Sequence, residues 1–573
     1  MRVAGLVIVF VMAKVSALAG RHLIVSWWAP VAYLWQDALV ALAFGAADFA
    51  LRARTRAAWV LYAALAAYSA INIPVARVLS TPLTWLMWRA ARGPLADSIW
   101  YYATWQNLAL SASVLACAIA APLLFRRTAR RPWVVASALS VALGPTAAAH
   151  VDTRGLEQNA WTALLATALP RVPSRASDRD WRRPPFARLT DGDLSWLRGA
   201  AAGRNVVLVS LESTAAQYLG IYGADPEVMP NLSELARSAI VFDNAYAVYP
   251  ESIKGLMSIL CSTYPAFDST AEEYASLPCQ SIATLASEHG YRTALFHSGR
   301  FGYLGMDAVV RHRGFDTLAD AGDIGGARNS SFGVDEPSTV SSILRWIDAL
   351  PRGQRFFVTY LPIAGHHPYE TPDRGPFADA DEFGRYRNAL HYGDQSLGTL
   401  VRGLRARGLG DRTLWIVLGD HGEAFGQHEG NFGHTFQLYE ENVHVPFLVA
   451  APGLLAGPTH SRNVVSLVDA APTLLDLVGL PRPAAYQGRS ALDGEPRMAL
   501  FFADYAQGLL GLRDGPRKFI LDITSGRKQL FDLDADAQER TGVAAREAAL
   551  AGWYADDLRD WSAAQEHRLK AHP

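Results

Sequence analysis

The first 149 residues carry long apolar stretches, whereas the remainder of the chain alternates short apolar runs with polar segments. Five stretches approach the ~20 apolar residues that cross a hydrocarbon core. They lie at residues 3–19, 27–49, 57–79, 103–125 and 132–149. The pattern predicts a five-helix transmembrane domain over residues 1–149.

Arginines between these stretches predict the topology. One cluster lies between the second and third spans and another between the fourth and fifth, so both lie on one side: Arg52, Arg54 and Arg56, then Arg126, Arg127, Arg130 and Arg131. The positive-inside rule makes that side the cytoplasm. With five spans, everything after Ala149 is extracytoplasmic. We therefore expect a multi-pass protein of a bacterial-type inner membrane with a periplasmic domain.

The first 19 residues allow a second interpretation, a cleaved signal peptide, because Ala17-Leu18-Ala19 resembles a cleavage site. Lys14 interrupts the apolar core and further spans follow, which favours a retained helix. Residues 82–102 mix Trp and Tyr with Arg, and are expected along the outer interface or as a simple loop. Residues 150–203 are predicted to be a linker, with an interfacial helix at 155–169 and an exposed part at 170–185.

From residue 205 the pattern becomes that of an α/β domain, over residues 204–573. Short β-rich runs occur at 206–211, 240–242, 292–297, 356–361, 414–418 and 445–450. Helical segments at 230–238, 281–289, 338–350 and 383–407 separate them. This alternation predicts a mainly parallel sheet covered on both faces, with functional residues at the carboxyl ends of its strands.

Composition and charge add little to this picture. Lys and Arg number 53 against 54 Asp and Glu, so no basic excess indicates a nucleic-acid partner. Of the three cysteines, Cys117 lies in a predicted span. Cys261 and Cys279 lie in the exported part, where disulfides form. We predict that these two pair; the alternative is two free buried thiols.

The strongest candidate chemistry lies in residues 418–434, LGDHGEAFGQHEGNFGH, directly after a predicted buried strand. Asp420 and His421 end that strand, and Glu423 and His434 follow closely. Carboxylate and imidazole groups at a strand end suit a divalent cation such as Zn²⁺ or Mn²⁺. The alternative is a surface loop rich in His and Glu. Glu212, at the end of the 206–211 strand, is a plausible further ligand or a surface residue.

Ser252 precedes an apolar helical stripe and follows Pro250, so it is predicted near a helix N-terminus. That position favours an anion or an ionised oxygen. A metal-bound serine oxygen there would be a nucleophile towards phosphorus or sulfur. A plain N-cap serine is the alternative. Lys254 either neutralises the anion or is solvated.

Further histidines follow predicted strands. His297 ends one strand and is followed by Arg300, while His366 and His367 follow the 356–361 strand. A lone histidine is usually a hydrogen-bonded core or surface residue. Several of them at strand ends, together with His434, favour a functional cluster.

The order Glu212, Ser252, His366, Asp420-His421, His434 resembles the alkaline phosphatase superfamily, specifically its sulfatase-like branch. Family-like landmarks run through the exported part: MPNL at 229–232, FDNAY at 242–246, HHP at 366–368, VPF at 445–447, DAAPTLL at 469–475 and FDL at 531–533 with Glu539. The resemblance implies an alkaline-phosphatase-like fold with a small C-terminal subdomain at about 495–560.

Five spans ahead of such a domain resemble the layout of lipoteichoic acid synthases and of phosphoethanolamine transferases. The resemblance implies that Glu212, Ser252, Asp420 and His421 hold one metal, with Ser252 as nucleophile. It places His297, His366 and His434 in the substrate pocket, where some relatives hold a second ion. Substrate contacts would also come from Lys254, Arg300, Tyr303 and His367.

Two departures separate this chain from true sulfatases. Leu211-Glu212 stands where sulfatases have paired aspartates, and Ser252-Ile253-Lys254-Gly255-Leu256 lacks the motif for formylglycine formation. Unmodified serine is therefore expected, forming a phosphoserine ester while His366 or His434 protonates the leaving oxygen. The expected donor is a membrane phospholipid of phosphoglycerol or phosphoethanolamine type, and the acceptor an envelope glycan or lipid. Two alternatives remain: a hydrolase of phosphate or sulfate esters, and a non-catalytic lipid sensor.

Overall fold

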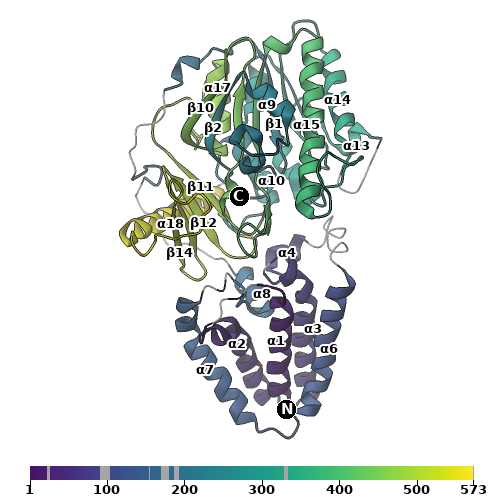
Figure 1. The fold of residues 1–573 in the computed structure, drawn as a ribbon, viewed down its shortest axis with the longest axis vertical. Helices are drawn as coiled ribbons and strands as arrows, with labels where there is room; N and C mark the ends of the chain where they lie inside the picture. Colours follow the sequence, from purple (N-terminus) through teal and green to yellow (C-terminus); the bar gives the residue numbers. More distant parts are fainter. Residues whose placement is uncertain are drawn as a thin grey trace. The chain divides into compact units, whose positions relative to one another are not determined.

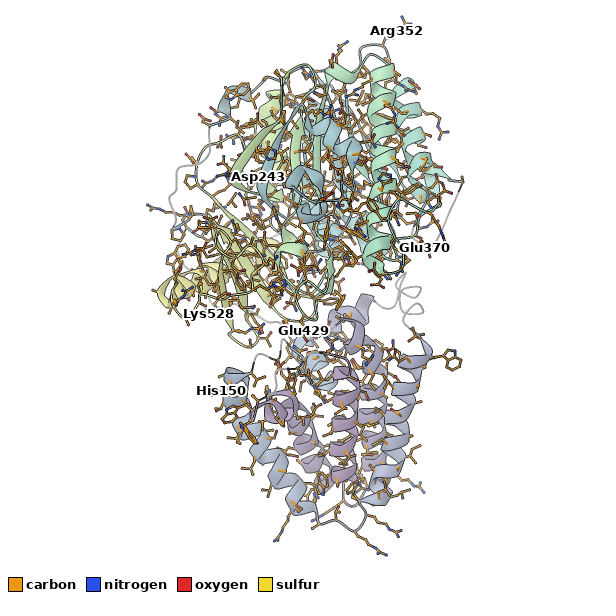
Figure 2. The ribbon with its side chains drawn as sticks, viewed as in Figure 1. His150, Asp243, Arg352, Glu370, Glu429 and Lys528 are labelled. Carbon is orange, nitrogen blue, oxygen red and sulfur yellow. A yellow bond between two sulfur atoms is a disulfide. The ribbon has the colours of Figure 1, made fainter. Side chains whose placement is uncertain are left out.

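The computed structural model describes residues 1–21, 23, 26–79, 81–90, 103–151, 153, 155–169, 180–185, 193–327 and 333–571 (Figure 1). The chain divides into two compact units. The first comprises Met1–Arg171 with His428–Phe432 and Tyr505–Gln507, and the second comprises Val172–Gln427, Gly433–Asp504 and Gly508–Pro573. Figure 2 adds the side chains and marks Asp243 and Lys528 in the second unit.

The first unit is helical. It contains α1 (Arg2–Leu18), α2 (Ala29–Ala50), α3 (Thr55–Leu79), α4 (Trp85–Ala90), α6 (Trp105–Leu124), α7 (Arg130–His150) and α8 (Ala160–Ala168). Among the described residues, α2, α3, α6 and α7 are long and apolar enough to cross a membrane. These four helices confirm a multi-pass membrane protein.

The first predicted span forms α1, a helix of 17 residues. At ~1.5 Å per residue it is shorter than the ~30 Å hydrocarbon core. Leu6, Val9 and Phe10 of α1 are buried in one core cluster with residues of α2, α3 and α6. A fifth span, and the topology that depends on it, therefore stays a prediction.

The predicted interfacial helix at 155–169 forms α8, whose N-cap Asn159 accepts a hydrogen bond from the backbone N–H of Trp161. The structure describes only part of the other predicted connecting segments. Residues 91–102 of the expected interfacial segment and residues 170–179 of the expected exposed linker lie outside the described residues.

The second unit is built on an eight-stranded sheet in the order β10-β2-β9-β6-β1-β5-β3-β4. Its strands are β1 (Asn205–Leu211), β2 (Ala239–Tyr246), β3 (Arg292–His297), β4 (Thr317–Ala319), β5 (Phe356–Leu361), β6 (Thr413–Gly419), β9 (Phe447–Ala450) and β10 (Thr459–Ser466). Only β9 runs against its neighbours, β2 and β6. The mixed, mainly parallel sheet confirms the predicted fold class.

Helices cover both faces of this sheet. On one face α9 (Pro230–Ala236), α14 (Glu336–Asp348) and α15 (Glu382–Ala406) share a core with Val207 and Val209 of β1. The alternate β1 residues Val206 and Leu208 are equally buried, as in a strand between two helical layers. A second group of helices packs together: α10 (Ser252–Cys261), α11 (Ile282–Glu288) and α17 (Ala470–Val478).

Short elements complete the α/β part: α12 (Met306–Val310), α13 (Ala321–Ile324), α16 (Glu440–Val443), β7 (Ala424–Phe425) and β8 (Phe432–Gly433). A small antiparallel sheet follows, with β11 (Met498–Ala503), β12 (Leu509–Asp514), β13 (Arg517–Asp522) and β14 (Lys528–Asp532) in sequence order. The last helix, α18 (Ala548–Lys570), packs on β12, β13 and β14. This antiparallel subdomain is the one implied for residues 495–560, extended by α18 to Lys570.

Candidate active site

The pairing of β1 with β6 brings together candidate ligands that are far apart in the sequence. Leu211 pairs with Gly419, and the backbone N–H of Asp420 donates to the carbonyl of Leu211 over 3.1 Å. The next residues, Glu212 after β1 and Asp420-His421 after β6, therefore lie side by side. Their ligand atoms all fall within 4.8 Å of one another, and all three side chains are buried.

Ser252 is the first residue of α10 and points at this cluster. Its Oγ donates to Oε2 of Glu212 over 2.9 Å and lies 3.3 Å from Nε2 of His421. The helix is capped by Glu251, whose carboxylate accepts from the backbone N–H of Ile253. The plain N-cap alternative for Ser252 therefore does not describe this helix, and its hydroxyl faces the carboxylates.

The three buried groups fit a divalent cation. His421 donates from Nδ1 to the carbonyl of Gly422, so the lone pair of the neutral ring is on Nε2. That atom lies 3.4 Å from Oε1 of Glu212 and 3.6 Å from Oδ2 of Asp420. A backbone carbonyl that fixes the ring through its other nitrogen is usual for metal-binding histidines.

The electrostatics of the cluster favour positive charge. Burial, reinforced by the charge of Glu212, raises the pKa of Asp420 to about 7. Burial opposes the charged form of His421, but Asp420 and Glu212 outweigh it and raise its pKa to about 10. Two carboxylates removed from water need a neighbouring cation. The donor set of carboxylates, imidazole and hydroxyl therefore fits Zn²⁺ or Mn²⁺.

Ser213 supports the cluster and was missed by sequence reasoning. It has φ +52°, a left-handed conformation uncommon for a residue with a side chain. In that conformation its N–H donates to Oδ1 of Asp420 over 3.0 Å, and its Oγ donates to Oε1 of Glu212 over 2.9 Å. Tyr386 donates to the Ser213 carbonyl over 2.6 Å. Nothing in the local sequence marks this turn.

His434 reaches the same site from the loop after β6. Its ring centre is 4.2 Å from that of His421, and its Nδ1 lies 2.7 Å from Oε2 of Glu423. Tyr369 donates to the other carboxylate oxygen of Glu423 over 2.9 Å. Glu423 thus orients His434, and His421, Glu423 and His434 form a second group able to hold a cation.

The remaining predicted histidines lie at the ends of β3 and β5. His297 donates from Nδ1 to the carbonyl of Leu361, and His366 donates from Nδ1 to the carbonyl of His367. With Nδ1 as the donor, the lone pair of each imidazole tautomer is on Nε2. The ring of Tyr303 packs edge-on against His366 at 6.1 Å. Burial lowers the pKa of His367 to about 4, so this ring is neutral near pH 7.

Two residues that were predicted to contact substrate, Lys254 and Arg300, have neighbours that the sequence did not predict. The Lys254 ammonium is buried and pairs with Asp504 at 2.9 Å, over the ring of Tyr249. The Arg300 guanidinium lies beside Gly322. A role for either in substrate binding stays a prediction. Cys261, at the end of α10, forms a disulfide with Cys279.

Comparisons with known proteins agree with this architecture. Residues 204–480 match the family model described as Sulfatase. The chain is 26% identical over 320 residues to the lipoteichoic acid synthase-like YvgJ of Bacillus subtilis (strain 168), covering 52% of this chain and 51% of that protein. It is 34% identical over 172 residues to arylsulfatase K of Bos taurus, covering 27% of this chain and 31% of that protein.

Among solved structures, a protein in the alkaline phosphatase superfamily from Vibrio parahaemolyticus superposes with a TM-score of 0.55. It is 21% identical, and the match covers 72% of this chain and 97% of that one. The chain spans about half the length of YvgJ and less of arylsulfatase K. The match to the solved structure supports a shared fold.

Proposed function

Residues 204–480 belong to the sulfatase family within the alkaline phosphatase superfamily, and from this premise we propose a membrane-anchored phosphotransferase. It moves a phospholipid head group, of phosphoglycerol or phosphoethanolamine type, to an envelope glycan or lipid. The intermediate is a phosphoserine ester at Ser252. The catalytic domain faces the extracytoplasmic side, where both substrates are found.

One observation carries the proposal: the Ser252 Oγ lies within 2.9 Å of Glu212 and 3.3 Å of His421, at the start of α10. The free N–H groups and positive dipole end of a helix stabilise an anion there. Four candidate spans place the site in a chain attached to a membrane, where a lipid donor is accessible. The similarity to a lipoteichoic acid synthase-like protein supports transfer from a lipid.

Glu212, Asp420 and His421, with Ser252, would hold a divalent cation. When bound, it would supply Lewis-acid stabilisation of the phosphoryl oxygens and lower the pKa of the serine hydroxyl. Ser252 attacks the phosphorus in line; the Oγ–P bond forms as the bond from phosphorus to the diacylglycerol oxygen breaks. The proton that Ser252 loses is balanced by the one that the leaving alcohol gains. Nε2 of His366 or His434 is the atom suited to deliver it.

The test is intact mass spectrometry of the full chain in detergent with Mn²⁺ or Zn²⁺. Substrates are phosphatidylglycerol, phosphatidylethanolamine, and nitrophenyl phosphate and sulfate. The expected result is a head-group phosphate adduct with diacylglycerol released, present in wild type and in the control Ser341→Ala and absent from Ser252→Ala. Ser341 is an exposed residue of α14.

The similarity to arylsulfatase K favours one alternative, a hydrolase. Turnover of the nitrophenyl esters without an adduct from either lipid would establish that alternative. Neither adduct nor turnover would leave the lipid sensor as the better hypothesis.

A further inference from the structure

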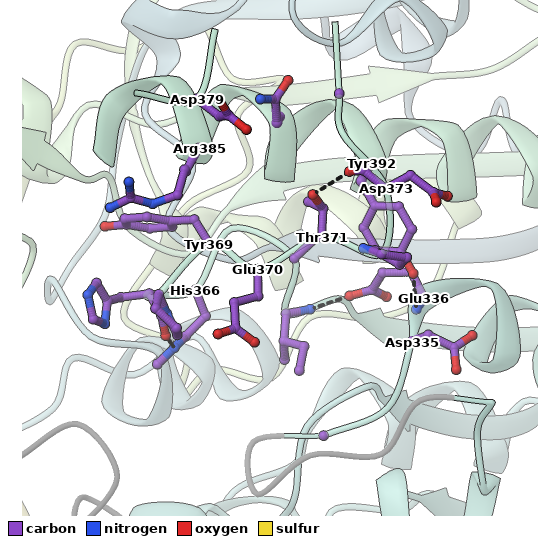
Figure 3. A pocket seen from close by; sticks show the side chains of 18 of the residues that line it. Asp335, Glu336, His366, Tyr369, Glu370, Thr371, Asp373, Asp379, Arg385 and Tyr392 are labelled. Carbon is purple, nitrogen blue, oxygen red and sulfur yellow. Dashed lines mark hydrogen bonds between the residues drawn. The ribbon is translucent and has the colours of Figure 1, made fainter. Parts of the chain in front are cut away.

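A cavity of about 600 Å³ opens beside the histidines that follow β5 (Figure 3). Its walls come from the loop after β5, from the start of α14 and from α15. Figure 3 shows His366 and Tyr369 on one side of the view and Asp335, Glu336 and Tyr392 on the other. Its volume lies within the ~300–1,000 Å³ typical of sites for small ligands.

His366 joins this cavity to the candidate metal cluster. It lines the cavity, and the preceding residue, Gly365, packs so closely against Glu212 that an added Cβ would lie 2.2 Å from the Glu212 carbonyl oxygen. Because Nδ1 of His366 donates to the carbonyl of His367 over 2.6 Å, the lone pair of the neutral ring is on Nε2. A hydroxyl bound beside this ring would therefore meet a proton acceptor.

Carboxylates outnumber cations in the lining. Five carboxylic side chains line the cavity against two guanidinium groups, Arg374 and Arg385. Glu336 is occupied: it accepts from Oγ of Ser298 and from the backbone N–H of Ile363, and burial raises its pKa. Arg374 lies 3.9 Å from one of the other carboxylates, Asp379. The exposed Glu370 and Asp373 remain to meet a ligand.

The excess of carboxylates over guanidinium groups favours some classes of ligand over others. A phosphate or carboxylate on the ligand would face like charge here, which disfavours its binding. Sugar hydroxyls are hydrogen-bond donors, and ionised carboxylates accept from donors more strongly than neutral groups do. The rings of Tyr369 and Tyr392 add apolar surface suited to the faces of a sugar ring.

We propose that this cavity binds the acceptor of the transfer, and that the acceptor end is a neutral, polyhydroxylated sugar rather than an anionic polymer end. The inference rests on the proposed phosphotransferase function. An acceptor hydroxyl forms a bond to phosphorus as the Ser252 Oγ–P bond breaks. Its proton passes to Nε2 of His366, and the proton that the acceptor loses balances the one that the departing Ser252 oxygen regains.

Binding is tested first in the absence of phosphoryl transfer, by calorimetry on the full-length Ser252→Ala protein. The probes are maltose, lactose and chitobiose as neutral sugars, and maltose 6′-phosphate as the anionic match. At least one neutral sugar should bind at least ~10-fold more tightly than the phosphate. Adding Glu370→Gln and Asp373→Asn should lower the affinity for the neutral sugar by about 5–10-fold, because charged hydrogen-bond acceptors are lost. Glu288→Gln, an exposed carboxylate of α11 outside the cavity, is the control.

The same variants are then assayed for transfer from the lipid that forms the Ser252 adduct. The expected change is a 5–10-fold rise in the KM for the neutral acceptor, of about the size of the binding loss. If phosphoserine formation falls by the same factor, the cavity holds the donor and the inference is overturned. Tighter binding of maltose 6′-phosphate than of every neutral sugar overturns it as well. Failure of the wild type to form any adduct instead overturns the proposed function, while the binding assay still reports on the cavity.

Discussion

The ammonium of Lys254 lies 2.9 Å from Oδ2 of Asp504, and both side chains are buried. Asp504 also accepts from the hydroxyl of Tyr249 over 2.6 Å and from the backbone N–H of Asp268 over 2.8 Å. The pair joins the first turn of α10, which carries Ser252, to the residue after β11. Lys254 therefore fixes the position of the helix that carries Ser252 from inside the protein.

We expect Lys254→Met to destabilise the protein by ~3–5 kcal/mol, because it leaves the Asp504 charge buried without its cation. The double variant Lys254→Met/Asp504→Asn should recover part of that loss. Chemical denaturation of the full chain in detergent measures both. A Lys254→Met protein of wild-type stability with a raised KM for the lipid donor would instead show that Lys254 contacts substrate.

Glu423 is expected to act through His434. Glu423→Gln should lower kcat by about 10–100-fold, the usual effect of removing the partner of a functional histidine. Tyr369→Phe removes only a hydrogen bond to the same carboxylate and should cost less. Steady-state kinetics with phospholipid donor give the comparison. Equal losses in the two variants would mean that the Glu423 region supports the fold rather than His434.

The sequence predicted the strands that carry the site because they are buried on both faces. β3 and β5 begin and end at the predicted residues, β1 begins one residue earlier than predicted, and β6 is one residue longer at each end. Two strands of the eight-stranded sheet, β4 and β10, were not predicted, for physical reasons. β4 has only three residues, and β10, THSRNVVS, is polar over its first half because its early side chains are exposed. Neither carries an apolar run.

The candidate ligands could be predicted because they directly follow strands, where parallel neighbours meet. The residues that orient them could not. Ser213 depends on a left-handed turn, and Asp504 reaches Lys254 from a position 250 residues further along the chain. Such contacts arise from tertiary packing, and no local periodicity reports them. The same limit applies to the ion pair of Lys254 with Asp504, which no local pattern indicates. The predicted contact of Lys254 with substrate stays a prediction.

A cation bound by the carboxylate cluster should stabilise the folded protein. At a concentration ~100 times its Kd, the gain is about 2.7 kcal/mol. We expect Mn²⁺ or Zn²⁺ to raise the thermal midpoint of the wild type after chelation, and to raise that of Glu212→Gln much less. Differential scanning fluorimetry in detergent is sufficient. An equal rise in both proteins would place the cation elsewhere.

The disulfide between Cys261 and Cys279 closes a loop with a sequence separation of 18 residues. A cross-link of that span contributes ~3 kcal/mol through the unfolded state. The double variant Cys261→Ser/Cys279→Ser should lose about that much stability in oxidising buffer, and reductant should bring the wild type to the same level. Cys117→Ser is the control, since that thiol is free. Insensitivity of the wild type to reductant after partial unfolding would contradict a stabilising bridge.

The stability of the C-terminal subdomain should depend on pH through Glu539. Lys518, which is fully buried, lies 2.9 Å from both Glu440 and Glu539, so one cation serves two carboxylates. Burial and the charge of Glu440 raise the pKa of Glu539 to about 7 from an ordinary value of 4.5. Glu440 is also buried, but the charge of Lys518 outweighs that burial and lowers the pKa of Glu440 to about 2. Between pH 4.5 and 7 the folded protein therefore binds a proton at Glu539 that the unfolded chain has lost.

Stability from this group is then present at low pH and lost as pH rises through the folded pKa of about 7. Glu440 works in the opposite direction, and its contribution is lost only as pH falls towards 2. Glu539→Gln should flatten the decline in the free energy of unfolding between about pH 5 and pH 7. Denaturant titrations at several pH values test this against Glu288→Gln, an exposed carboxylate for which the wild-type slope should persist. A slope unchanged in Glu539→Gln would mean that Lys518 keeps both carboxylates ionised across this range.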